Sequence, residues 1–178
     1  MKFIDKKGFT LIEVIVVAGI IAILAGILVP IVFKEIDEAK ITRTYADERS
    51  ISNAVFVFRK DTGRWPVMND VCNPVVTFMS GDGNYPGDVA AKGFDLTVDS
   101  SFNNHLPQNT FGCYSNWKGP YIARISTDPW GNSYICNIKG FSTAGAPVWI
   151  ISGGPDGQMQ TNAADITVSG DDIGLRLQ

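Results

Sequence analysis

The hydrophobic positions of this chain begin with one long uninterrupted run near the N-terminus. From Phe9 to Phe33 only one side chain is ionisable, that of Glu13. A helix over these residues, at about 1.5 Å per residue, is longer than the ~30 Å hydrocarbon core of a membrane requires. The run therefore predicts a transmembrane helix over residues 9–33.

After this run, the apolar residues recur first at a helical spacing and then in short strand-like segments. The i, i+3, i+4, i+7 pattern is occupied by Ile51, Ala54, Val55 and Phe58, so we expect the helix to continue to about Lys60. Three apolar segments bounded by Gly, Pro or Asn then predict a small antiparallel sheet: 134–138, 148–152 and 173–177. The predicted fold class is α+β: one long N-terminal helix, then this sheet with a Gly/Asp-rich C-terminal loop.

The remaining residues predict a single globular domain over 34–178. Within it, residues 67–115 hold many turn residues and no sustained periodicity, which is typical of a loop-rich region with at most a short helix. We expect His105, which lies there, at the surface or in a turn. A single histidine excludes any catalytic or metal scheme that needs two imidazoles. The sequence also lacks G-x-S-x-G and G-x-x-x-x-G-K-[ST], so we expect no enzyme.

Charge gives the orientation of the predicted membrane helix. Three lysines precede it, whereas residues 34–178 hold 12 basic and 16 acidic side chains. Basic flanks stay on the cytoplasmic side, so the domain is expected on the far side of the membrane. With 15 Lys and Arg against 18 Asp and Glu, the net charge of −3 predicts no nucleic-acid partner.

A cleaved secretory signal and a plain signal anchor are the two simplest explanations of the apolar run. The run is longer than a secretory signal and ends without an A-x-A site. A plain anchor leaves Glu13 unexplained, because a carboxylate inside a membrane costs about 2.5–3.5 kcal/mol and no cation lies within the run. Cleavage between Gly8 and Phe9 would create an α-ammonium four residues before Glu13, protonated at neutral pH.

The residues around this bond resemble the class III leader of type IV pilins and pseudopilins. The matching stretch is Lys6–Val14, K-K-G-F-T-L-I-E-V. The resemblance implies that residues 1–8 are a leader removed after Gly8 by a prepilin peptidase, which also N-methylates Phe9. It further implies that Glu13 pairs with the Phe9 ammonium of an adjacent subunit, so that the helix forms a homopolymer.

Two further stretches resemble the major pseudopilin of type II secretion systems. They are W-K-G-P-Y-I at 117–122 and D-P-W-G-N-S-Y at 128–134. This likeness implies a structural subunit of a periplasmic pseudopilus that drives protein export from the inner membrane. Its implied partners are an assembly platform, other pseudopilins and a cytoplasmic ATPase. The alternative is a type IV pilus subunit for adhesion, motility or DNA uptake.

The C-terminal region is rich in glycine and carboxylates. It contains four aspartates without a basic residue between them: Asp156, Asp165, Asp171 and Asp172. By themselves these residues fit either a solvated acidic loop or a Ca²⁺ site, since calcium prefers oxygen ligands. The G-P-D-G and D-D-I elements resemble the calcium loop of major pseudopilins, which favours calcium. The long spacer 158–170 leaves open whether Asp165 or Asp171 is the second acidic ligand.

Three cysteines allow one disulfide and one free thiol in an oxidising compartment. Cys72 and Cys113 flank the loop-rich region, whereas Cys136 lies in an apolar strand segment. We therefore predict a Cys72–Cys113 disulfide.

Overall fold

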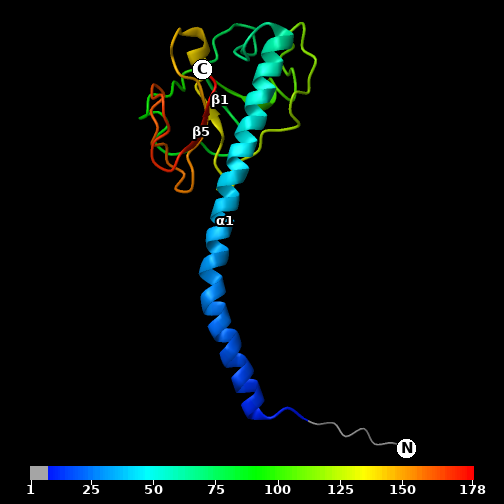
Figure 1. The fold of residues 1–178 in the computed structure, drawn as a ribbon. Coiled ribbons are helices and arrows are strands. Elements are labelled where there is room, and N and C mark those ends of the chain that lie inside the picture. Colours follow the sequence, from blue (N-terminus) through cyan, green and yellow to red (C-terminus); the bar gives the residue numbers. More distant parts are fainter. Residues whose placement is uncertain (1–7) are drawn as a thin grey trace, which may run out of the picture. The chain divides into compact units, whose positions relative to one another are not determined.

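A computed structural model describes residues 8–178 of the chain (Figure 1). Residues 1–7, which include Lys6 and Lys7 of the expected leader, lie outside the described residues. The chain divides into two compact units, one that ends at Ala39 and one that spans Lys40–Gln178. The elements in chain order are α1 (Leu11–Thr62), β1 (Phe78–Ser80), β2 (Asp99–Ser101), η1 (Phe102–Asn104), β3 (Ile135–Cys136), η2 (Ile138–Ser142), β4 (Trp149–Ser152) and β5 (Ile173–Arg176).

The first unit consists of the N-terminal part of α1 and leaves its apolar side chains uncovered. All of its described residues, 8–39, are exposed, and an 18-residue window has a mean hydropathy of 3.0. By its length and its apolar composition, this helix could cross a membrane. A helix that is apolar on every side is stable only in lipid or against other protein surfaces.

In the second unit, α1 ends close to the predicted position. The helix reaches Thr62, and Gly63 follows with φ of 71° while its N–H donates to Arg59 O at 3.0 Å. Glycine adopts this left-handed conformation without a Cβ penalty, which makes it the usual residue after a helix end. The predicted end at Lys60 is therefore two residues short.

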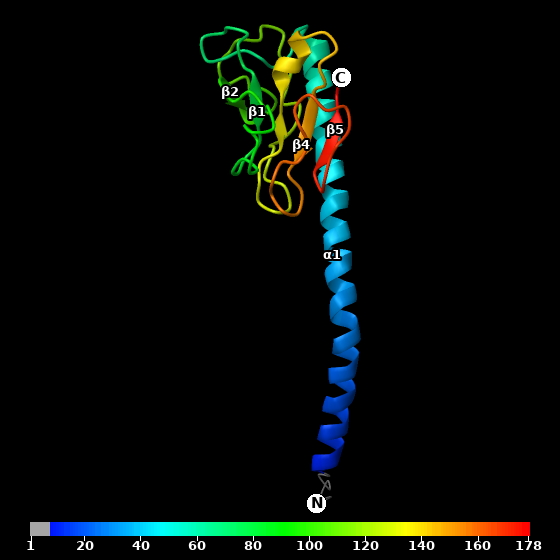
Figure 2. The same ribbon diagram turned by 90° about the vertical axis from the view of Figure 1, so that its left-hand side faces the viewer.

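A five-stranded sheet with the order β2-β1-β3-β4-β5 forms the rest of the framework (Figure 2). The β3–β4 and β4–β5 pairs are antiparallel, as predicted. The β1–β3 pair is also antiparallel, but β1 and β2 are parallel. The sheet is therefore mixed. The sequence missed β1 and β2 because each has three residues and lies in the loop-rich region; β2 is also polar, Asp-Ser-Ser.

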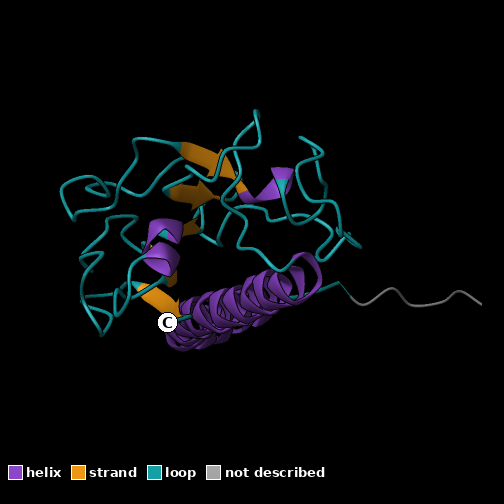
Figure 3. Ribbon diagram, turned by 90° about the horizontal axis from the view of Figure 1, so that it is seen from above, coloured by secondary structure: helices purple, strands orange, loops and turns teal. Residues whose placement is uncertain are grey.

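The second unit buries apolar side chains on both faces of this sheet. Consecutive strand residues belong to different clusters. Cys136 and Ile150 pack on α1, in a cluster with Ile51, Val55 and Phe58. Ile135 and Ile151, the residues next to them in β3 and β4, belong to a second cluster with Phe78, Phe94 and Met159. Figure 3 shows the helix along one side of the strands, with loops on the other. The helix face predicted at Ile51–Phe58 is therefore confirmed as a core face.

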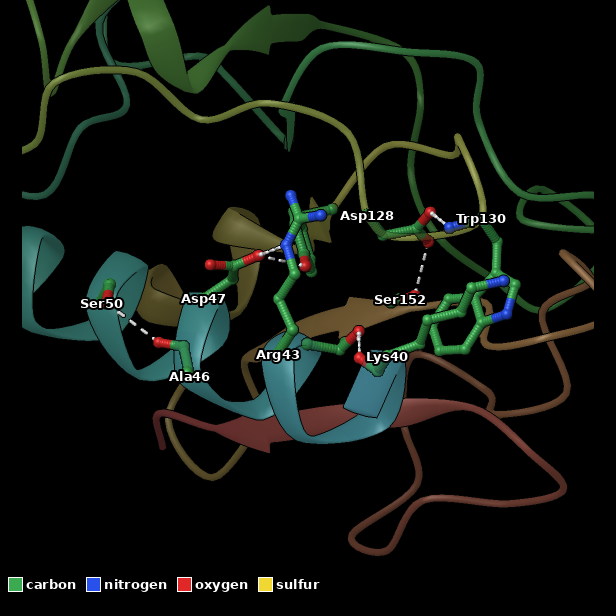
Figure 4. Close-up of polar contacts among 10 residues, drawn as sticks. Lys40, Arg43, Ala46, Asp47, Ser50, Asp128, Trp130 and Ser152 are labelled. Atoms are coloured by element: carbon green, nitrogen blue, oxygen red, sulfur yellow. Dashed lines mark hydrogen bonds and ion pairs between the residues drawn. The ribbon is translucent and has the colours of Figure 1, made fainter. Parts of the chain in front are cut away.

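Polar contacts occupy the border between α1 and the sheet (Figure 4). Arg43 Nε lies 3.4 Å from Asp47 Oδ2, and Ser152 Oγ donates to Asp128 Oδ2 at 2.6 Å. Glu48 is fully buried, and neither carboxylate oxygen has a hydrogen-bond partner among residues 8–178. Burial, followed by the charge of Asp47, raises the pKa of Glu48 to about 9, so this side chain is neutral at pH 7.

His105 lies in a turn directly after η1, as one of the two expectations had it, but it is buried in the core and not at the surface. Its side chain is fully buried, with Nε2 2.9 Å from Ser100 Oγ and Nδ1 3.1 Å from Tyr114 Oη. Burial lowers the pKa of His105 to about 4. The imidazole is thus a neutral link within the loop-rich region, where its polar partners replace water.

Candidate functional site

The bond expected to be cleaved lies in accessible, non-helical backbone. Gly8, Phe9 and Thr10 precede the first helical residue, and all three are exposed. A Cβ placed on Gly8 would meet no atom within 4 Å. Nothing within the described chain therefore requires glycine at position 8, and any requirement for it would come from the peptidase.

Glu13 caps the helix that begins beside this bond. Thr10 N and Thr10 Oγ1 donate to Glu13 Oε2 at 2.8 and 2.7 Å, and Glu13 N donates to Thr10 Oγ1 at 3.4 Å. This is a capping box, in which the residue before the helix and the third helical residue satisfy each other's backbone N–H groups. The T-x-x-E spacing was visible in the sequence, but our sequence analysis did not use it.

Phe9 and Glu13 line the same hollow along α1. Together with Val14, Val17, Ala18 and Ile21 they border an open groove of about 400 Å³. The Phe9 side chain is 89% exposed. Both hydrogen bonds that the Glu13 carboxylate accepts from Thr10 use the oxygen Oε2.

The D-P-W-G stretch forms a turn that is joined to β4. Asp128 Oδ1 accepts hydrogen bonds from Trp130 N at 3.0 Å and Asn132 N at 2.8 Å, and Asp128 Oδ2 accepts one from Ser152 Oγ. Gly131 has φ of 97°, which favours glycine. The role of this motif within the chain is therefore architectural.

In the C-terminal region, three of the four candidate aspartates are linked by hydrogen bonds. Asp156 N donates to Asp171 Oδ2 at 3.2 Å, and Gln160 Nε2 donates to Asp156 Oδ2 at 2.7 Å. Asp172 Oδ2 accepts from the backbone N–H groups of Gln160 and Thr161, at 2.9 and 2.6 Å. Burial raises the pKa of Asp172, although these backbone bonds oppose the shift.

A glycine lets the two ends of this loop approach each other. Gly154 has φ of 62°, and a Cβ there would lie 2.1 Å from the carbonyl oxygen of Asp171. Asp165 is bonded elsewhere, because its carboxylate accepts from Asn162 N and Nδ2 and its carbonyl accepts from Trp149 Nε1. The hydrogen bonds thus connect Asp171, and not Asp165, to Asp156.

The oxygen atoms of this loop, hereafter the Asp172 loop (residues 153–172), offer partial support for a cation. No group of three or more His, Cys, Asp and Glu side chains among residues 8–178 has the geometry to hold a metal. However, Asp172 Oδ1 and Gln160 Oε1 are both buried without a hydrogen-bond partner. Such oxygens are costly unless a cation or donor satisfies them. Gln160 is a candidate that sequence reasoning missed, since it looked only for carboxylates.

The disulfide predicted from the cysteine positions is present in the structure. Cys72 and Cys113 are bonded, and Cys136 is a free, buried thiol. Burial raises the pKa of Cys136 far above its usual range, so this thiol is unreactive.

Comparison with known proteins places these features in a family. Residues 101–170 match the family described as type II secretion system (T2SS), protein G, and residues 5–29 match the prokaryotic N-terminal methylation motif. The type II secretion system core protein G of Escherichia coli K12 is 30% identical over 168 residues, which cover 94% of each chain. The chain belongs to the type II secretion system core protein G family. No solved structure matches it.

Other proteins named type II secretion system core protein G are similar to this chain over most of its length. That of Pseudomonas aeruginosa is 30% identical and covers 91% of this chain, and that of Klebsiella pneumoniae is 26% identical and covers 95%. The chain is therefore a pseudopilin, a structural subunit that carries the motif of prepilin-peptidase processing. These relatives do not favour the alternative role in a type IV pilus.

Proposed function

We propose that this pseudopilin is inserted in the inner membrane as a precursor, is cut between Gly8 and Phe9, and then assembles into a periplasmic fibre. The observation that carries the proposal is the exposed apolar part of α1, on which Glu13 is the one carboxylate between Phe9 and Phe33. Copies of the same segment would cover these side chains in the fibre. The domain, Lys40–Gln178, would lie on the periplasmic side.

The new N-terminus would supply a cation for Glu13, since the apolar run itself contains none. Cleavage frees the Phe9 ammonium, which lies four residues before Glu13 along one groove. The capping box occupies Oε2, and the Phe9 ammonium of an adjacent copy would bind the other oxygen. This ion pair would fix the register of neighbouring subunits, because an unpaired carboxylate is costly in an apolar interior. N-methylation of Phe9 keeps the charge.

The proposed partners follow from this role. They are further copies of the chain, a prepilin peptidase, other pseudopilins and an inner-membrane platform driven by a cytoplasmic ATPase. The chain itself would act as a structural subunit and not as an enzyme.

Calcium would stabilise the Asp172 loop. The residues that would hold it are Asp171 and Asp172, together with Asp156 and Gln160. Calcium would supply a positive charge to Asp172 Oδ1 and Gln160 Oε1, the two buried oxygens without a partner. This choice of oxygen donors fits a hard divalent cation. Asp165, bonded within its own turn, would not take part.

Substitution of Glu13 separates processing from assembly. We expect Glu13→Ala to be cleaved and N-methylated normally, while sheared fibres fall at least tenfold in cells that carry the secretion machinery. Ile12→Ala, an apolar change at the neighbouring position, is the control and should retain fibres. Wild-type amounts of fibre from Glu13→Ala would contradict the ion pair.

A further inference from the structure

The Cys72–Cys113 disulfide encloses a long segment of the domain whose elements are short. The two cysteines are 41 positions apart, and β1, β2 and η1 between them have three residues each. This segment supplies side chains to both hydrophobic clusters, among them Phe78, Met79, Val89, Phe94, Phe102 and Leu106. Ordering so long a segment costs conformational entropy, and a crosslink lowers that cost more when the loop it closes is longer. The core therefore depends on the disulfide.

The disulfide also lies beside the contacts that attach this segment to α1. Tyr114, the residue after Cys113, packs edge-on against Phe58 of α1, with ring centroids 4.7 Å apart. The Tyr114 hydroxyl accepts a hydrogen bond from Met68 N at 3.1 Å and lies 3.1 Å from His105 Nδ1. Loss of the crosslink would loosen the segment where it joins the helix.

A local turn presents Cys72 at the surface. Asn69 Oδ1 accepts hydrogen bonds from Val71 N at 3.2 Å and from Asn73 N at 2.9 Å, and Cys72 N donates to Asn69 O at 3.1 Å. These bonds all lie within residues 69–73, so the turn does not need the disulfide to form. Cys72 is exposed, whereas Cys113 is half-buried. In a reduced chain, Cys72 is therefore the more accessible of the two thiols.

The third cysteine is kept apart from this pair. Cys136 lies in β3 and is fully buried, in the cluster that packs on α1. The attacking species in disulfide exchange is the thiolate, and burial, which raises the pKa of Cys136, disfavours it. Oxidation of the folded chain is thus confined to Cys72 and Cys113.

We propose that Cys72 is the site at which a disulfide-bearing oxidant of the periplasm attacks this chain, and that oxidation to the Cys72–Cys113 form precedes addition to the fibre. The inference rests on the proposed function, which places the domain in an oxidising compartment. A reduced domain would lack the crosslink that supports its core. The fold thereby makes assembly depend on a redox step.

The oxidation is a pair of thiol–disulfide exchanges. The Cys72 thiol loses its proton and the thiolate attacks one sulfur of the oxidant, so that a mixed disulfide forms and the other sulfur of the oxidant leaves as a thiolate. The Cys113 thiolate then attacks Cys72 Sγ, which forms the internal disulfide and breaks the mixed one. Two electrons pass from the cysteines to the oxidant, which takes up two protons and departs as two thiols.

The redox state of the wild-type chain in cells tests the dependence without any substitution. The chain is produced with its secretion machinery, in cells with and without a periplasmic protein that bears an oxidising disulfide, and free thiols are alkylated at harvest. We expect the disulfide form and fibres in the first cells, and the dithiol form with at least fivefold less sheared fibre in the second. Oxidised glutathione added to the second cells should restore both, which would show that a small disulfide suffices.

Purified variants test the point of attack. The full-length chain is reduced in detergent micelles and treated with oxidised glutathione. Cys113→Ser should gain a glutathione adduct at Cys72 at least fivefold faster than Cys72→Ser gains one at Cys113, and Cys136 should stay unmodified in both. Equal rates, or a faster reaction at Cys113, would overturn the assignment of Cys72.

Substitution of the cysteines gives the matched comparison for assembly. The double variant Cys72→Ser, Cys113→Ser should unfold about 10 °C below the wild-type chain and form at least fivefold less fibre. Cys136→Ala, which removes the free thiol, should keep the disulfide and the fibres. Normal fibres from the dithiol form or from the double variant would overturn the redox dependence. Absence of fibres from the oxidised wild-type chain would instead overturn the proposed function, and the inference with it.

Discussion

Tyr134 Oη donates a hydrogen bond to Asp47 Oδ2 at 2.9 Å and thereby joins the residue before β3 to α1. The two residues are 87 positions apart in the sequence. Arg43 Nε lies 3.4 Å from the same Asp47 oxygen, and hydrogen bonds to a charged acceptor are stronger than those between neutral groups. Burial and the Asp47 carboxylate raise the pKa of Tyr134, so the phenol is a hydrogen-bond donor at neutral pH.

Replacement of Tyr134 by phenylalanine should therefore destabilise the domain without changing its packing volume. We expect a loss of about 1.5 kcal/mol, since the acceptor is charged and the bond is partly buried. Thermal unfolding of the full-length chain in detergent micelles, followed by near-UV circular dichroism, measures the effect. Tyr45→Phe, which removes an exposed hydroxyl from α1, should change stability by less than about 0.5 kcal/mol. Equal effects of the two substitutions would contradict the assignment.

The raised pKa of Glu48 should make the stability of the folded chain depend on pH. Its folded-state pKa of about 9 lies above the value of 4.5 expected in the unfolded chain. Between these values the folded state holds a proton that the unfolded state has lost, so stability falls by about 1.4 kcal/mol for each pH unit of increase. The facing groups are Asp47 on the same helix, Ser152 on β4, and Asp128, which is bonded to Ser152.

Glu48→Gln removes this titration and keeps the shape of the side chain. We expect the variant to unfold at a nearly constant temperature from pH 6 to pH 9, whereas the wild-type chain loses stability over the same range. Glu35→Gln, an exposed change on the same helix, should follow the wild-type chain. If Glu48→Gln showed the wild-type pH slope, Glu48 would have to be ionised and solvated in the folded protein.

Calcium should stabilise the wild-type chain through the Asp172 loop. After treatment with a chelator, addition of millimolar Ca²⁺ should raise the unfolding temperature by several degrees, because a ligand that binds only the folded state adds its binding free energy to stability. Asp172→Asn should remove the calcium-dependent rise, whereas Asp165→Asn should retain it. If Ca²⁺ left the unfolding temperature of the wild-type chain unchanged, the site would be ruled out. Loss of the rise in Asp165→Asn alone would transfer the ligand role to Asp165.

Much of the architecture was predictable because its signals are local. The apolar run at residues 9–33 and the helical spacing from Ile51 to Phe58 identify the two parts of α1 and the face that packs in the core. The apolar segments around Ile135, Ile150 and Ile173 likewise identify three of the five strands. In these elements, side-chain burial and backbone periodicity point to the same structure.

The remaining features depend on contacts between distant residues. The parallel strands β1 and β2 have three residues each, too few for a periodic pattern, and their pairing is set by the tertiary fold. His105 resembles a loop residue in sequence, but Ser100 and Tyr114 satisfy its two ring nitrogens and allow it to be buried. The link between Asp156 and Asp171 crosses 15 residues, which no spacing rule specifies.

The central claim is that this chain is a precursor whose mature form begins at Phe9, and its most direct test is the mass of the N-terminus. The full-length chain is extracted from membranes of cells with and without a prepilin peptidase, and intact mass and N-terminal sequence are determined. We predict a mature chain that begins with N-methyl-Phe9 when the peptidase is present, and an uncut chain when it is absent. A chain that begins at Met1 under both conditions would contradict the account and reduce residues 9–33 to a plain membrane anchor.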